Sequence, residues 1–205
     1  MMETIVTTTP GYRVYDYMLV LAPHAELSGR LKQLREEFCE KFRVQQPRRG
    51  WIYLPLVTFS QYAMAEDRIL NNLRLIAMGY PPFRVELKDF GSFPSHTIYV
   101  QATTKVPIQQ LVKNIRSSAQ KLMKLSDENK PHFIMEPHIT VAGKLLPWQY
   151  EKAWAEYMGK HFSGKFVADS MLLLRKAEGE SRYQATEKFS FQNLPVATRQ
   201  GELAF

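Results

Sequence analysis

Two short stretches decide how this sequence is interpreted: PLVTF at residues 55–59 and PHITV at residues 137–141. Both begin with proline and place a threonine before a final apolar residue, but the second has His138 where the first has Leu56. Side chains alternate between the two faces of a strand, so His138 and Thr140 are expected to point the same way. The likeness indicates either a two-part site that has lost one histidine or two unrelated strands.

The pattern of apolar residues places each stretch in a similar series of elements. Strands are predicted at 14–22, 51–60, 83–93, 96–103, 134–145, 164–176 and 183–191. Helices are predicted at 24–44, 65–78, 108–125 and 147–162. Divided near residue 94, each half contains a helix, a Pro-x-x-Thr strand, a second helix and a strand pair. This order predicts a duplicated α+β chain with two lobes, at about 14–94 and 95–195, with exchange of strands left open and 196–205 as a loose tail.

Composition is that of a soluble globular chain of 205 residues, with 45% hydrophobic and 23% charged residues. The net charge of +7 favours an anionic partner such as RNA or a nucleotide, although a solvated basic surface explains it equally well. A single cysteine, Cys39, excludes an internal disulfide framework. We expect no membrane contact and a cytoplasmic location, because no signal peptide or long apolar run is recognisable. Protein partners are not predicted.

His138 is the strongest candidate for chemistry among the five histidines. An imidazole titrates near neutral pH and can transfer protons, and the hydroxyl of Thr140 can bind a phosphate oxygen. Lys130 and Lys144 add positive charge nearby, whereas His132 is expected to be exposed in a polar loop. A structural histidine bonded within the core is the alternative. No spacing typical of a metal site is present, so neither metal nor cofactor is expected.

PHITV, with DFGSFPSHTIYV (89–100) before it and LLLRKAEGESRYQATEKFSF (172–191) after it, resembles the two-histidine phosphoesterase superfamily. The most similar branch is the 2'-5' RNA ligase-like (LigT-like) proteins, and the resemblance spans about residues 14–195. It implies two lobes of antiparallel strands with outer helices, each lobe offering a His-x-Thr/Ser motif to a central cleft. It also implies metal-free cleavage of a 2',3'-cyclic phosphate, or 2'-5' ligation in reverse. One imidazole would take a proton from water and the other would protonate the leaving ribose oxygen.

Under this resemblance, His138 and Thr140 match the second motif, but the first motif lacks its histidine. In one register Leu56 and Thr58 occupy it; in the other, Tyr53 and Pro55 do. The residues expected to line the site and bind substrate are Tyr53, Thr58, His96, Lys144, Arg175 and Tyr183. The predicted function is action on RNA ends or nucleotide 2',3'-cyclic phosphates with weak or absent turnover. The alternatives are an inactive RNA- or nucleotide-binding module and a structural or protein-interaction role.

Overall fold

The computed structural model describes residues 10–45, 51–177 and 179–195. Its strands are β1 (Val14–Leu21), β2 (Leu54–Tyr62), β3 (Phe83–Phe93), β4 (Thr97–Ala102), β5 (His132–Phe133), β6 (His138–Ala142), β7 (Ser163–Ala168), β8 (Ser170–Ala177) and β9 (Gln184–Ser190). Its helices are α1 (Ala25–Lys41), α2 (Glu66–Gly79), α3 (Lys105–Met123) and α4 (Pro147–Tyr157), with short 3-10 turns at Pro10–Tyr12 and Ala63–Ala65.

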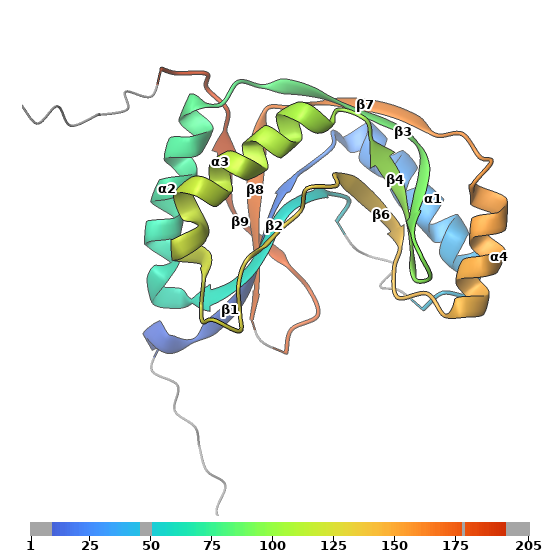
Figure 1. The fold of residues 1–205 in the computed structure, drawn as a ribbon, viewed down its shortest axis with the longest axis horizontal. Helices are drawn as coiled ribbons and strands as arrows, with labels where there is room; N and C mark the ends of the chain where they lie inside the picture. Colours follow the sequence, from blue (N-terminus) through green and yellow to red (C-terminus); the bar gives the residue numbers. More distant parts are fainter. Residues whose placement is uncertain (1–9, 46–50, 178, 196–205) are drawn as a thin grey trace, which may run out of the picture.

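The strands form two antiparallel sheets, each covered by a pair of helices (Figure 1). The first sheet has the strand order β5-β2-β1-β8-β9 and is packed by α2 and α3. The second sheet has the order β6-β4-β3-β7 and is packed by α1 and α4. The predicted α+β architecture of two antiparallel sheets with outer helices is therefore confirmed.

The two sheets do not follow a division of the chain at residue 94. Strands β8 and β9, from the end of the chain, complete the sheet that β1 and β2 begin. Helix α1 lies between β1 and β2 in sequence, yet it packs against β6 and β7 of the second sheet. The chain thus crosses between the lobes several times, and each lobe depends on segments distant in sequence.

One predicted strand, 164–176, is wrong as a single element. Asp169 separates β7 from β8, and these strands belong to different sheets. Aspartate is unfavourable in strands, and at Asp169 the chain passes from the second sheet to the first: its carbonyl accepts a hydrogen bond from the amide of Phe191 at 2.8 Å, which continues the β8–β9 register. The predicted polar loop 126–133 also ends in the two-residue strand β5, which is too short to leave a periodic pattern. The predicted tail, 196–205, lies outside the described residues.

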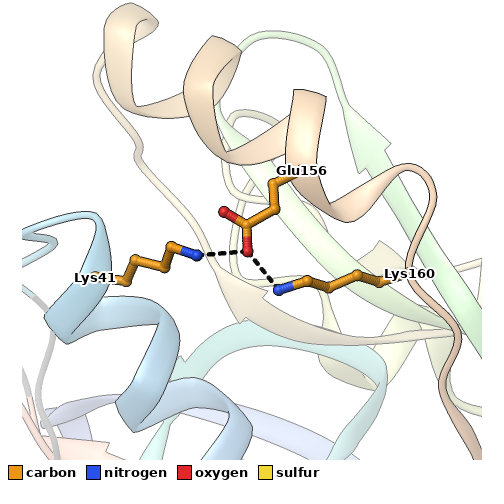
Figure 2. A network of polar contacts seen from close by, with 3 residues as sticks. All are labelled: Lys41, Glu156 and Lys160. Carbon is orange, nitrogen blue, oxygen red and sulfur yellow. Dashed lines mark hydrogen bonds and ion pairs between the residues drawn. The ribbon is translucent and has the colours of Figure 1, made fainter.

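Aromatic packing fixes α1 and α4 against the second sheet. The ring of Phe38 lies 4.8 Å from that of Phe42 and 5.1 Å from that of Tyr157, and Tyr157 lies 4.9 Å from Phe90 of β3. Above this cluster, Glu156 accepts hydrogen bonds from Lys41 and Lys160 (Figure 2). Exposed ion pairs contribute little to stability, so the buried rings hold the two helices together.

Candidate functional site

His138 begins β6, and a backbone carbonyl holds its imidazole. Its Nδ1 lies 2.6 Å from the carbonyl oxygen of Glu136. A carbonyl can only accept, so Nδ1 carries the proton and the lone pair of Nε2 is left for another partner. Burial lowers the pKa of His138, and this outweighs the opposing effects of the Glu136 carbonyl and carboxylate. The geometry therefore favours a neutral imidazole that can accept a proton at neutral pH.

Two aromatic rings support the imidazole. Phe93 meets it edge to face at 5.0 Å between centroids, and Tyr99 lies 4.8 Å away at a tilt. Gly91 is paired with Tyr99 across β3 and β4, and a Cβ at position 91 would lie 2.5 Å from the Tyr99 ring. The end of β3, Phe90-Gly91-Ser92-Phe93, thus makes room for the ring of Tyr99 and supplies the ring of Phe93.

Thr140 shares the face of His138, and an arginine covers its backbone. In β6, His138 is paired with Gln101 and Thr140 with Tyr99. Strand β6 is the edge of the second sheet, and Arg35 of α1 donates from Nη2 to the Thr140 carbonyl at 2.8 Å. This bond satisfies a carbonyl at a sheet edge where no strand is hydrogen-bonded.

Sequence reasoning missed Arg35, which is the most buried cation near these residues. Burial lowers its pKa, and it is close enough to Tyr53 for their charges to interact. No carboxylate pairs with Arg35 in the described part of the chain. The signal was available, because Arg35 follows Leu31 by four residues and precedes Phe38 by three, on the buried stripe of an amphipathic helix. A cation at such a position requires a partner, and here the partner is the Thr140 carbonyl of β6.

The first stretch, in β2, contains a bulge at Leu56. Leu19 of β1 pairs with Val57 and Val20 pairs with Pro55, so Leu56 has no counterpart. Leu56 is fully buried, whereas Tyr53 and Thr58 are only partly so. A bulge changes which residues share a face. Tyr53, rather than Leu56, therefore lies beside Arg35, and burial raises the pKa of its phenol.

Thr58 lines a pocket of about 280 Å³ on the first sheet, here called the Thr58 pocket. Its lining residues are Asp16, Tyr17, Thr58, Phe59, Ser60, Asn129, Lys130, His132 and Tyr183. His132 is exposed as expected, but it lies in β5 rather than in a loop and pairs with Thr58. Burial, followed by the charge of Asp16, raises the pKa of Tyr183 to about 12, so its phenol is neutral at neutral pH.

The remaining predicted site residues, Lys144, His96 and Arg175, lie in three different parts of the fold. Lys144 lies beside Thr140 in a separate groove of about 680 Å³. His96 is exposed in the β3–β4 turn, where its Nδ1 lies 3.0 Å from the Thr97 hydroxyl. Arg175 is paired: its Nη1 lies 2.7 Å from the carboxylate of Glu66, the first residue of α2.

Within residues 10–45, 51–177 and 179–195, no three histidine, cysteine or acidic side chains are grouped as a metal site would require. In the same ranges, no helix combines the length and apolar character needed to cross a membrane.

Comparison with known proteins defines the class. Residues 23–180 match the 2'-5' RNA ligase superfamily, and the chain belongs to this family. The fold resembles TT0787 of Thermus thermophilus at a TM-score of 0.65 and 19% identity, covering 86% of this chain and 98% of that one. Two Escherichia coli LigT structures are also similar: the complex with 3'-AMP (TM-score 0.57, 16% identity) and the complex with ATP (0.59, 15%), each covering 87% of this chain and 98% of LigT. The LigT-like two-histidine phosphoesterase resemblance is confirmed. No curated protein sequence matches this chain significantly.

Proposed function

We propose that this chain acts on the phosphate of RNA ends or of nucleoside 2',3'-cyclic phosphates, without a metal and with His138 as its principal proton-transfer group. The observation that carries the proposal is the geometry of His138. A backbone carbonyl fixes its proton on Nδ1, burial keeps it neutral, and the Thr140 hydroxyl lies on the same face. These features are what a general base beside a phosphate needs.

In the proposed hydrolysis, a water oxygen bonds to phosphorus while its proton passes to Nε2 of His138. One ribose oxygen leaves phosphorus and takes a proton from solvent water, and His138 later returns its own extra proton to solvent. The hydroxyl of Thr140 and the guanidinium of Arg35 would bind the non-bridging oxygens of the phosphate. Because no carboxylate pairs with Arg35 among the described residues, its positive charge can balance their negative charge. Tyr53 can donate a hydrogen bond there, but its raised pKa makes it a poor base at neutral pH.

The site is proposed to be one-sided because β2, the strand of the first motif, contains no histidine. His132 stands beside Thr58, but on the adjacent strand rather than two residues along β2. The leaving ribose oxygen would therefore be protonated less efficiently than by an imidazolium across the site. Slow turnover is expected, since each proton-transfer role is worth about 10²–10⁴-fold in rate.

A nucleotide-binding module without turnover is the second candidate. The LigT structures with 3'-AMP and ATP support binding of nucleotide phosphates by this fold, and the net charge of +7 agrees with an anionic ligand. In that case affinity would fall as salt rises, because bound cations are released from the nucleic acid.

The test measures hydrolysis of a nucleoside 2',3'-cyclic phosphate, with EDTA present, by wild type and by His138→Ala, His132→Ala and His96→Ala. We expect slow turnover that His138→Ala reduces by about 10²-fold or more, with the exposed His96→Ala as the matched control. Full activity of His138→Ala would contradict the proposal. An equal loss in His132→Ala would show a two-histidine site. Absent turnover with His138-dependent binding of 3'-AMP would favour the binding module.

A further inference from the structure

A groove runs from Thr140 to the start of α4, and we call it the Trp148 groove. The side chains that matter to the argument are Arg43, Thr140, Lys144, Leu146, Trp148 and Gln149. Its volume of about 680 Å³ is in the range of small-molecule sites. Thr140 belongs to both this groove and the site around His138, so a ligand in the groove would adjoin a phosphate bound there.

Buried polar contacts hold the two sides of the groove together. Gln149 is 6% exposed; its Nε2 donates to the carbonyls of Phe42 and Arg43, both at 3.1 Å. Its Oε1 accepts from the amide of Leu146 at 3.0 Å. One buried side chain thus joins the end of α1 to the start of α4. The aromatic cluster of Phe38, Phe42 and Tyr157 connects the same helices, so the groove is preformed.

The exposed side chains of the groove combine an apolar surface with positive charge. Trp148 is 52% exposed and Leu146 is 54% exposed, although both are large hydrophobic residues. Arg43 and Lys144 both lie in the left-handed backbone region, at φ angles of 51° and 54°. No acidic residue lines the groove in the described part of the chain. An indole beside two unopposed cations suits a ligand with a flat ring and a negative backbone, which is the composition of a nucleotide.

We propose that the Trp148 groove binds a second nucleotide, the one linked to the nucleotide whose terminal phosphate lies at His138, with its base on Trp148 and its backbone phosphate near Arg43 and Lys144. This inference rests on the proposed function and names its substrate class: a single-stranded oligonucleotide end rather than a free mononucleotide. Stacking on an indole is tolerant of base identity, because every base has a π face. The groove therefore selects for chain length and not for sequence.

The test compares the affinities of 3'-AMP and of a three-residue oligoadenylate with a 3'-terminal phosphate. The oligonucleotide is expected to bind wild type about tenfold more tightly, since one stacked base accounts for about that factor. Trp148→Ala should remove this advantage and leave 3'-AMP affinity unchanged, whereas Trp148→Phe should keep most of it. Met158→Ala is the matched control, because Met158 is exposed at the other end of α4.

Lys144→Gly tests the charge separately, since glycine fits the left-handed backbone and the fold should not be strained. For the oligonucleotide, it should make the negative slope of log affinity against log salt shallower by about 0.7. The slope for 3'-AMP should not change. Equal affinity of wild type for the two ligands, or equal oligonucleotide affinities of Trp148→Ala and Met158→Ala, would overturn the proposal that the groove binds a nucleotide. If 3'-AMP still binds wild type in that case, the proposed function stands. Failure of 3'-AMP to bind wild type would instead overturn the proposed function and the groove with it.

Discussion

Strands β6 and β2 carry the two similar stretches, yet they present different chemistry. In β6 the regular alternation places His138 and Thr140 together, and rings from β3 and β4 support the imidazole. In β2 the bulge turns Leu56 into a core residue and leaves Tyr53 and Thr58 partly exposed. A two-lobed fold can therefore persist while the polar groups of its lobes diverge, because the core requires buried volume and not a particular site residue.

The largest predicted effect is on the free energy of unfolding. It should differ between Leu56 and Thr58, the two residues of PLVTF that align with His138 and Thr140. Leu56→Ala is expected to lower the free energy of unfolding by about 2–5 kcal/mol, because it leaves a cavity in the core. Thr58→Ala should cost less than about 1 kcal/mol, since its side chain lines an open pocket. Urea denaturation measures both. A small, equal cost at the two positions would mean that Leu56 faces the site, as the simplest alignment assumes.

The next effect, on the affinity for 3'-AMP, should distinguish Arg35 from Arg30 on the same helix. Arg35→Gln is expected to weaken 3'-AMP binding by about 1.5–3 kcal/mol, the range of hydrogen bonds to charged groups. Arg35→Lys keeps the charge and should recover part of the loss. Arg30→Gln is the control, because Arg30 lies on the same helix, is exposed, and donates to the carbonyl of Ser163 in β7 instead of to β6. Calorimetric titration measures the affinities, and matching values for Arg35→Gln and Arg30→Gln would exclude Arg35 from the phosphate site.

The smallest effect concerns pH. Burial lowers the folded-state pKa of His138 below the unfolded value of about 6.5. The unfolded chain then binds more protons between the two pKa values, so the stability contributed by His138 is present above about pH 6.5 and is lost as pH falls through the folded pKa. Proton NMR of the His138 ring should give a midpoint below the unfolded value of about 6.5. A higher midpoint for His138 would contradict a buried neutral base.

The sequence predicted most of the fold because the helices and longer strands have clear apolar periodicity. The whole of β3 was predicted with its bounds, and α1 within a few residues. The division of 164–176 at Asp169 was missed because the prediction treats the segment as one continuous run, although its buried alternate positions shift by one residue there, from Phe166 and Ala168 to Met171 and Leu173. Strand membership of the sheets depends on pairings distant in sequence, which no local pattern records.

The candidate site was predictable on one side only. His138 and Thr140 follow from a two-residue spacing that a regular strand preserves. Pro55 favours an edge or a bulge in this strand, but the position of the bulge at Leu56 could not be foreseen, because it is defined by the pairing with β1. Arg175 looked like a free cation beside the last hairpin until the position of Glu66, at the start of α2, was known. Ion pairs between distant elements are decided by tertiary structure.

The most direct test of the one-sided site is to restore an imidazole to β2. Tyr53→His combined with Pro55→Thr rebuilds a His-x-Thr motif at the partly exposed positions, and Leu56→His rebuilds one with Thr58 at the bulge. Hydrolysis of a nucleoside 2',3'-cyclic phosphate should rise by on the order of 10²-fold in the Tyr53→His, Pro55→Thr variant and not in Leu56→His, which should also be less stable. A gain in Leu56→His without a gain in the other variant would contradict the account.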